Sequence, residues 1–210
     1  LRDTEGWWFY WCFRAHCPAG REVTFHFTNR NVLTAMGPSV SDDGVHWRWL
    51  GPGAVEGDAF RFRFPGDGAG MFFTFSIPYL ESHLRSFLWR HRGRDELRVS
   101  TLTTSERGRP VEKIALADPE AAAPGKVLLT ARHHACESVA NCVLEGIMDF
   151  ALDRSTGLLD RAEFLIVPFV DKDGVEDGDQ GKNRRPHDHN RDYADRPLYA
   201  ATRALMQTLE

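Results

Sequence analysis

Two short apolar runs separated by an amphipathic stretch constrain the fold of this chain more than any other feature. Val127–Ala131 and Glu163–Val170 are typical of strands covered on both faces. Between them, apolar residues recur at i, i+3, i+4, i+7, i+8 and i+11, which predicts a helix. These are Ala140, Val143, Leu144, Ile147, Met148 and Ala151. A strand, helix, strand order indicates an α/β layer fold with a largely parallel sheet, whose ligand site lies beyond the carboxyl ends of the strands.

Further elements flank this unit. Leu97–Thr103 and Val111–Leu116 are predicted strands. A last helix is predicted with Asp195 as its N-cap and Pro197 in its first turn. Its apolar face is formed by Leu198, Ala201, Leu205 and Leu209.

The first third of the chain has a different pattern, alternation with period two. Segments 23–27, 45–49, 60–64 and 73–77 alternate apolar and polar residues, and the aromatic run Trp7–Trp11 is interpreted as another strand that serves core packing rather than ligand stacking. Several short strands at this spacing predict a small antiparallel β-sandwich. A helix follows, on Leu80, Leu84, Phe87 and Leu88, and the charged segment 91–96 is the predicted linker. We therefore expect an N-terminal sandwich with its linking helix over 1–92 and an α/β domain over 93–210.

Composition excludes several classes of function. The 210 residues are 42% hydrophobic and 27% charged, with a net charge of -4 and no concentrated run of Lys or Arg. This argues against a nucleic-acid or membrane-surface protein, and no apolar stretch approaches the roughly 20 residues that span a bilayer. Cys12 and Cys17 are spaced to pair across a turn in a secreted protein, but free buried thiols are the favoured interpretation. The chain begins at Leu1 rather than Met, so the absence of a signal peptide carries no weight.

A cluster of metal-binding side chains directly follows the first apolar strand. His134 and Glu137 lie three residues apart across a strand-to-helix turn, where both side chains can reach one metal ion. Imidazole nitrogen and carboxylate oxygen are suitable zinc donors, and a catalytic zinc takes three protein ligands and one water. Taken alone, such a pair is more often an ordinary surface pair.

A second cluster follows the second apolar strand. Asn190 and Arg191 are adjacent, and such a pair suits a carboxylate, because Arg offers a planar fork of donors and Asn adds an amide donor. Taken alone, this stretch is equally well a solvated charged loop.

Together the two clusters resemble the zinc carboxypeptidase family, most closely its cytosolic-carboxypeptidase branch. His134-Ala135-Cys136-Glu137 matches the family's His-x-x-Glu after a buried strand. Pro168 and then Asp171-Lys172-Asp173-Gly174 correspond to its Asn-Pro-Asp-Gly stretch, and Asp188-His189-Asn190-Arg191 to its Asp-x-Asn-Arg. The aromatic strand with Trp8-Phe9-Tyr10 resembles the start of the sandwich that precedes the peptidase domain in this branch, so the resemblance covers nearly the whole chain.

The resemblance implies a fold, an activity and a role for each motif. It implies a mixed carboxypeptidase sheet, hydrolysis of C-terminal peptide bonds on peptides or protein tails, and a cytoplasmic location. His134 and Glu137 would hold zinc, and Asn190 and Arg191 would hold the substrate's C-terminal carboxylate. An Arg in the preceding loop would stabilise the oxyanion; Arg184 is the choice, with Lys182 and Arg185 as rivals.

The chain also departs from the family pattern. Ala135-Cys136 stands where Pro-Gly is frequent, and Cys136 is interpreted as a packing residue rather than an extra ligand. The family's third zinc ligand and its general base come later than Glu210, so we expect an incomplete site that binds zinc weakly and does not turn over at a normal rate. His187 and His189 are weak substitutes for the missing ligand, and Glu145 and Glu163 are poor candidates for the base.

Three alternatives remain open at this point. Aspartoacylase-like zinc amidohydrolases share the His-x-x-Glu and a later Asn-Arg, but they lack a sandwich before it. A non-catalytic module that binds C-terminal carboxylates would keep Asn190 and Arg191 and bind no zinc. In the third, both clusters are surface accidents of a two-domain protein.

Overall fold

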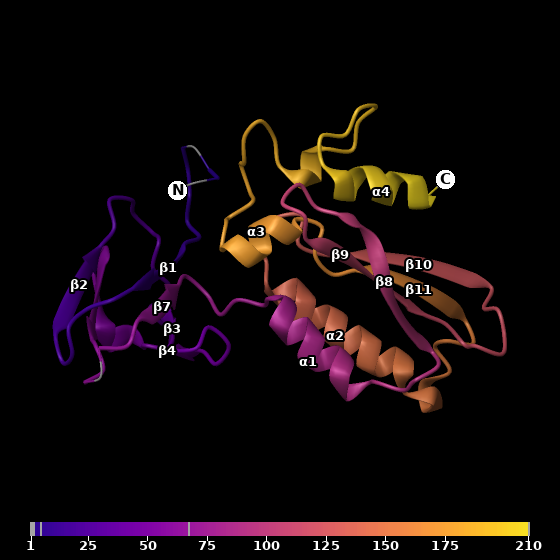
Figure 1. The fold of residues 1–210 in the computed structure, drawn as a ribbon, viewed down its shortest axis with the longest axis horizontal. Helices are drawn as coiled ribbons and strands as arrows, with labels where there is room; N and C mark the ends of the chain where they lie inside the picture. The colour runs from indigo at the N-terminus through magenta and orange to yellow at the C-terminus, as the bar shows by residue number, and fades with distance from the viewer. Residues whose placement is uncertain (1–2, 5, 67, 210) are drawn as a thin grey trace.

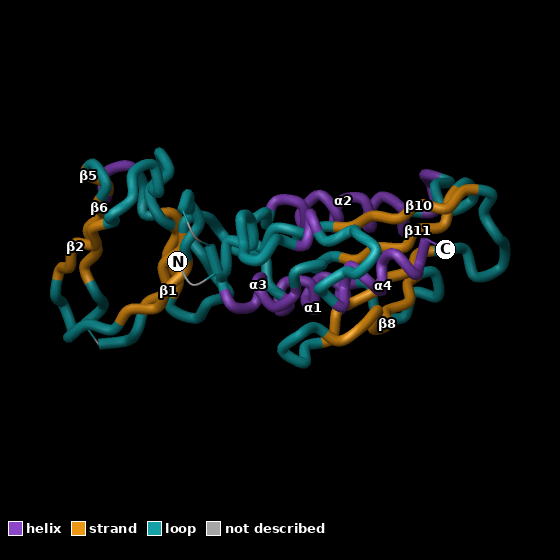
Figure 2. Tube along the Cα trace, turned by 90° about the horizontal axis from the view of Figure 1, so that it is seen from above, coloured by secondary structure: helices purple, strands orange, loops and turns teal. Residues whose placement is uncertain are grey.

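The computed structural model describes residues 3–4, 6–66 and 68–209. Its elements form two parts, a small all-β part and an α/β part (Figure 1). Seen from above, the two parts lie end to end along the long axis of the molecule (Figure 2). The fold class predicted from the sequence, a sandwich followed by a mixed α/β sheet, is confirmed.

The β part is a sandwich of two antiparallel sheets. One sheet has the order β1-β7-β3-β4, and the other has the order β2-β6-β5. The strands are β1 Cys12–Ala15, β2 Glu22–His26, β3 Ser39–Ser41, β4 Arg48–Trp49, β5 Val55–Glu56, β6 Ala59–Arg63 and β7 Met71–Thr74. Period-two alternation sends Phe60 and Phe62 of β6 inward beside Phe73 of β7, and Arg61 and Arg63 outward. The stacked aromatic rings of this core hold the two sheets together.

Of the strands predicted in this part, 7–11 is absent from the described residues, and 45–49 is shortened to β4. Trp7–Trp11 is irregular chain, and the first strand begins only at Cys12. Residues 45–47 lie in a loop organised by Asp43, whose carboxylate accepts hydrogen bonds from the backbone N–H groups of Val45 and His46. In residues 45–47 the hydrogen bonds to the Asp43 carboxylate override the alternation, and in the aromatic run 7–11 the backbone N–H groups of Phe9 and Tyr10 bond to the Gln180 side chain instead of to a strand.

The α/β part contains a four-stranded sheet of order β10-β11-β9-β8. Its strands are β8 Leu97–Thr104, β9 Pro110–Leu116, β10 Gly125–Thr130 and β11 Ala162–Val167. Among the described residues only β10 and β11 pair in parallel, whereas β9 pairs antiparallel with both of its neighbours. The sheet is therefore mixed, as expected, but less parallel than the strand–helix–strand order indicates.

Helices cover both faces of this sheet (Figure 1). Helices α1 Glu81–Arg90 and α2 Val139–Leu152 pack on one face, and α4 Ala200–Leu209 packs on the other. The short helix α3 Lys172–Asp177 follows β11, and 3-10 turns span Pro52–Ala54, Arg154–Thr156 and His189–Arg191. The apolar stripe predicted for α2 is confirmed at Leu144, Met148 and Ala151, but Val143 is 56% exposed and does not belong to it.

Helix α4 begins later than predicted, and its cap is a different residue. Asp195 does not cap it; the carboxylate of Asp192 accepts hydrogen bonds from the backbone N–H groups of Leu198 and Tyr199. Helix α1 packs through Leu84 and Phe87 in the core of the α/β part, and the division of the chain at residue 92 stays a prediction. Cys12 and Cys17 are free thiols, as predicted, but they are only partly buried. Within the described ranges, no helix is both long and apolar enough to cross a bilayer.

Candidate metal and carboxylate site

The two predicted metal ligands face each other across the turn that follows β10. The Nδ1 atom of His134 lies 2.9 Å from Oε1 of Glu137. The His134 side chain is buried and that of Glu137 is half exposed, so the pair opens to solvent at the carboxylate. Donor atoms at this separation can share one zinc ion at ordinary bond lengths of about 2.0–2.2 Å.

Asp188 links this pair to the second predicted cluster. Its Oδ2 atom lies 3.3 Å from Nε2 of His134, and its Oδ1 atom lies 3.4 Å from Nη1 of Arg191. Arg191 and Asn190 are both exposed, on the 3-10 turn that Asp188 precedes. The two clusters that are more than fifty residues apart in the sequence therefore lie on one side of the molecule.

Arg132 holds the backbone of the His134–Glu137 turn from within the core. It adopts φ +60°, is buried, and donates from Nε to the carbonyl of Ala135. Its Nη1 donates to the carbonyl of Tyr79 and to the Asn141 side chain. Because burial disfavours the charged form, it lowers the pKa of Arg132, and only neutral acceptors satisfy the guanidinium directly. The turn is thus fixed by a cation that forms no ion pair within the described residues.

Cys136 is a packing residue. It is buried inside the turn, and burial, followed by the negative charge of Glu137, raises the pKa of its thiol to about 12. Its burial among the residues of the turn supports the predicted packing role.

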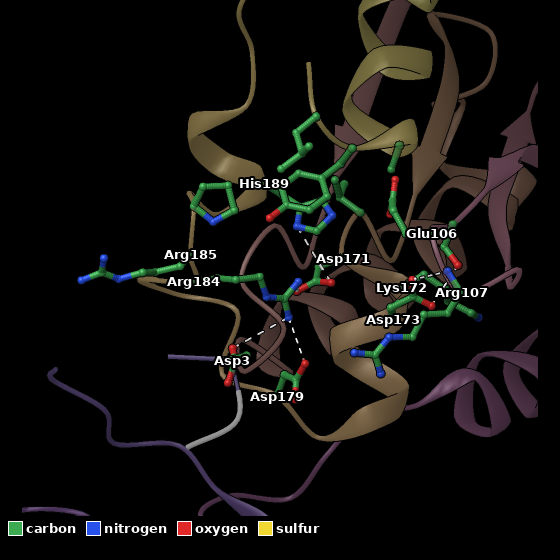
Figure 3. A pocket seen from close by; sticks show the side chains of 16 residues that line it. Asp3, Glu106, Arg107, Asp171, Lys172, Asp173, Asp179, Arg184, Arg185 and His189 are labelled. Carbon is green, nitrogen blue, oxygen red and sulfur yellow. Dashed lines mark hydrogen bonds and ion pairs between the residues drawn. The ribbon is translucent and has the colours of Figure 1, made fainter. Parts of the chain in front are cut away.

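The predicted oxyanion residue, Arg184, lies among three carboxylates. Its guanidinium lies 2.9 Å from Asp171, 3.1 Å from Asp179 and 3.8 Å from Asp3. Figure 3 shows it pointing into this group of carboxylates, in a pocket of about 440 Å³ that Asp171 and His189 also line. Within the described residues, no hydrogen bond or ion pair joins Arg184 to His134 or Glu137, and its oxyanion role stays a prediction.

The two alternative candidates for the oxyanion role, Lys182 and Arg185, lie in the same loop as Arg184. Arg185 lines the same pocket as Arg184 (Figure 3). Lys182, by contrast, directly follows Gly181, where a Cβ atom would lie 2.4 Å from the backbone nitrogen of Ala135, so the chain at Lys182 runs beside the His134–Glu137 turn, called the metal turn below.

His189 is buried in the wall of this pocket. Its ring stacks on Tyr199 with the centroids 3.7 Å apart, and its Nδ1 atom has no hydrogen-bond partner. Burial, followed by the charge of Arg184, lowers the pKa of His189 to about 4, so the ring is neutral at pH 7. His187 is paired with Asp192 at 2.5 Å. Neither His is placed to join His134.

His134 and Glu137 can supply two of the ligands of one zinc ion. The Nε2 atom of His134 is buried without a hydrogen bond of normal geometry, and Asp188 is its nearest acidic neighbour. A carboxylate behind a ligating His is the usual way to hold the proton on the far nitrogen and leave the near one free for metal. Over the ranges that the structure describes, no group of three or more His, Cys, Asp or Glu side chains is arranged around one ion.

Three residues that the sequence reasoning did not assign hold this site in place: Asp188, Arg132 and Gln180. Asp188 is the first residue of the Asp-x-Asn-Arg motif, and Arg132 begins the first cluster. The sequence motifs could therefore have pointed to both residues. Gln180 lies in no recognisable sequence motif, because only the tertiary fold brings its hydrogen-bond partners to it.

Comparisons with known proteins identify the family and the fold. A family model described as zinc carboxypeptidase matches residues 89–204. Cytosolic carboxypeptidase 2 of Homo sapiens and that of Macaca fascicularis are each 31% identical over 146 residues, or 64% of this chain. The chain spans only 16% and 17% of those two relatives.

Solved structures show the same fold. The metallo-carboxypeptidase from Burkholderia cenocepacia has a TM-score of 0.75 and 22% identity, over 95% of this chain and 57% of that one. A metallo-carboxypeptidase from Pseudomonas aeruginosa, in complex with (2-guanidinoethylmercapto)succinic acid, has a TM-score of 0.73 and 20% identity, over 99% of this chain and 58% of that one. Since the family model matches more than half of its residues, this chain belongs to the zinc carboxypeptidase family.

Proposed function

We propose that this chain forms part of a zinc metallocarboxypeptidase that removes C-terminal residues from peptides or protein tails. The single observation that carries the proposal is the 2.9 Å approach of His134 Nδ1 to Glu137 Oε1, backed by Asp188 at His134 Nε2. Family membership supports it. The aspartoacylase-like and non-catalytic alternatives are not favoured, because the matched family and the solved structures are carboxypeptidases.

Each residue of the site has a proposed role. His134 and Glu137 hold zinc, and Asp188 keeps the proton of His134 on Nε2 so that Nδ1 is free for the metal. When bound, zinc polarises the scissile carbonyl and lowers the pKa of its water. Asn190 and Arg191 bind the substrate's terminal carboxylate from an exposed turn, where an incoming chain end can reach them.

The oxyanion role is better assigned to Lys182 than to Arg184. A developing negative charge is stabilised by a fixed positive group whose charge is not already balanced. Three carboxylates surround Arg184, whereas Lys182 directly follows Gly181, whose backbone packs against Ala135 of the metal turn. A cytoplasmic location is proposed from the names of the cytosolic relatives.

Zinc binding tests the proposal directly. We expect the purified chain to bind one zinc ion weakly, through His134 and Glu137, measured by equilibrium titration and by competition with a weak chromogenic chelator. His134→Gln and Glu137→Gln should each weaken binding at least about tenfold, because each removes a ligand. His187→Gln is the matched control, since His187 pairs with Asp192 instead. Zinc binding that neither ligand substitution changes would refute the proposed site.

A further inference from the structure

A single glutamine lies where the sandwich, the metal turn and the Lys182 loop meet. Gln180 is completely buried. Its side-chain Oε1 accepts hydrogen bonds from the backbone N–H groups of Phe9 and Tyr10, at 2.8 and 3.1 Å. Its Nε2 donates to the carbonyl of Lys182 at 2.9 Å. One side chain therefore joins the segment before β1 to the loop that follows α3.

The backbone of Gln180 is bonded to the metal turn itself. Its carbonyl accepts a hydrogen bond of 3.1 Å from the N–H group of Cys136, the residue that directly precedes Glu137. The next residue, Gly181, approaches so closely that a Cβ atom there would lie 2.4 Å from the backbone nitrogen of Ala135. The loop and the turn are thus in direct backbone contact, and a shift of one must move the other.

The N-terminal segment holds the loop on its other side as well. The carboxylate of Asp3 accepts a hydrogen bond of 2.7 Å from the N–H group of Gly181. The Thr4 hydroxyl donates to the carbonyl of Lys182 at 3.2 Å. Asp3 also reaches Arg184 at 3.8 Å, as Figure 3 shows. These contacts leave the loop little freedom on the side that faces the sandwich.

We propose that Gln180 is a positioning residue through which the N-terminal sandwich sets the geometry of the His134–Glu137 turn and of Lys182. This inference rests on the proposed function, because it gives the sandwich a role in the same site. Gln180 touches neither ligand; it acts through the backbone of Cys136 and through the carbonyl of Lys182. Removal of a residue that supports a metal ligand typically weakens metal binding by about 10- to 100-fold.

The test compares wild type with Gln180→Glu, Gln180→Met and Thr74→Val. Gln180→Glu keeps the acceptor for Phe9 and Tyr10 but sets an oxygen against the Lys182 carbonyl. Gln180→Met loses the hydrogen bonds to Phe9, Tyr10 and Lys182, and it is compared with wild type provided that it folds. Thr74→Val is the matched control: Thr74 is also completely buried, and its hydroxyl contacts the carbonyls of Trp11 and Ser76 and the Tyr10 hydroxyl, but neither Gln180 nor the metal turn.

Three quantities are measured: the free energy of unfolding in urea, the hydrogen exchange rate of the Cys136 amide in metal-free protein, and the zinc Kd. Both Gln180 variants should speed exchange at Cys136 by about tenfold, the effect of one lost buried hydrogen bond, and raise the zinc Kd by about 10-fold or more. Thr74→Val should lower the free energy of unfolding and leave the other two quantities unchanged.

The outcomes separate this inference from the proposed function. If wild type binds no zinc, the proposed function fails, and exchange at Cys136 alone decides whether Gln180 positions the turn. If wild type binds zinc and the Gln180 variants match it in both exchange and Kd, the inference is wrong. Equal changes in Thr74→Val would also overturn it, because they would show a general loss of stability rather than positioning.

Discussion

The carboxylate of Asp188 lies 3.3 Å from the Nε2 atom of His134, on the side of the ring opposite to Glu137. The imidazole therefore has two acidic neighbours, for which we propose different roles. Glu137 shares the Nδ1 side, where a metal would bind, and Asp188 receives the proton on the other nitrogen. The same carboxylate contacts Arg191, so the metal pair and the carboxylate pair depend on one residue.

Asp188→Asn should weaken zinc binding by about 10- to 100-fold, because a neutral amide holds the Nε2 proton of His134 less strongly than a carboxylate. The measurement is the zinc Kd by chelator competition. Asp192→Asn is the control: Asp192 is equally buried, but it caps α4 and contacts His187. We expect that variant to lose stability and keep its zinc Kd. Equal effects of the two substitutions on Kd would contradict the role of Asp188.

Arg191→Met should abolish binding of peptides with a free C-terminus while changing the free energy of unfolding by no more than about 0.5 kcal/mol, because the side chain is exposed. Arg191→Lys should not restore binding, since an ammonium lacks the bidentate fork. Fluorescence anisotropy with a labelled peptide and its C-terminal amide measures the difference. The exposed Arg196 of the same loop supplies the control, Arg196→Met. An amidated peptide that binds as well as the free acid would rule out carboxylate recognition.

Lys172→Met should destabilise the fold by about 3–5 kcal/mol, because it leaves buried carboxylates without their cation. The Lys172 ammonium is 1% exposed and lies 2.7 Å from Glu81 and 2.5 Å from Glu112. Burial raises the pKa of Glu112, so this carboxyl depends on Lys172 for its charge. Urea unfolding measures the loss, and adding Glu112→Gln to Lys172→Met should recover part of it. Lys126→Met, at an exposed position on β10, should have little effect.

Acid should destabilise the protein through His189. Its pKa is about 4 in the folded state and about 6.5 in the unfolded state, so the unfolded chain binds the extra proton first. The contribution of the neutral ring is complete above pH 6.5 and is lost as the pH falls towards 4. Between pH 7.5 and 5 this amounts to about 2 kcal/mol.

His189→Phe keeps an aromatic ring against Tyr199 and removes the titrating group. Urea unfolding at pH 7.5 and at pH 5 should therefore show a smaller loss of stability in this variant than in wild type. Parallel losses in the two proteins would assign the acid sensitivity to other groups.

The secondary structure that the sequence predicted well is the part set by local periodicity. The alternation over 60–64 and the helical spacing of Leu84 and Phe87 each placed a strand or a helix correctly. The strand predicted over Trp7–Trp11 was wrong because the backbone there bonds to the side chain of Gln180, which lies some 170 positions later in the chain. The N-cap of α4 was wrong because Asp192 reaches the helix start from further away than Asp195.

The sequence by itself determined which chemistry is available here: a His and a Glu three residues apart after one buried strand, and an Asn-Arg pair after the next. Only the tertiary structure decided which charges remain usable. Arg184 is drawn away by Asp3, Asp171 and Asp179, and Asp188 is turned towards His134. The reason is physical: spacing along the chain sets what one turn can hold, but the partner of a buried charge is chosen by what folding brings within a few ångströms.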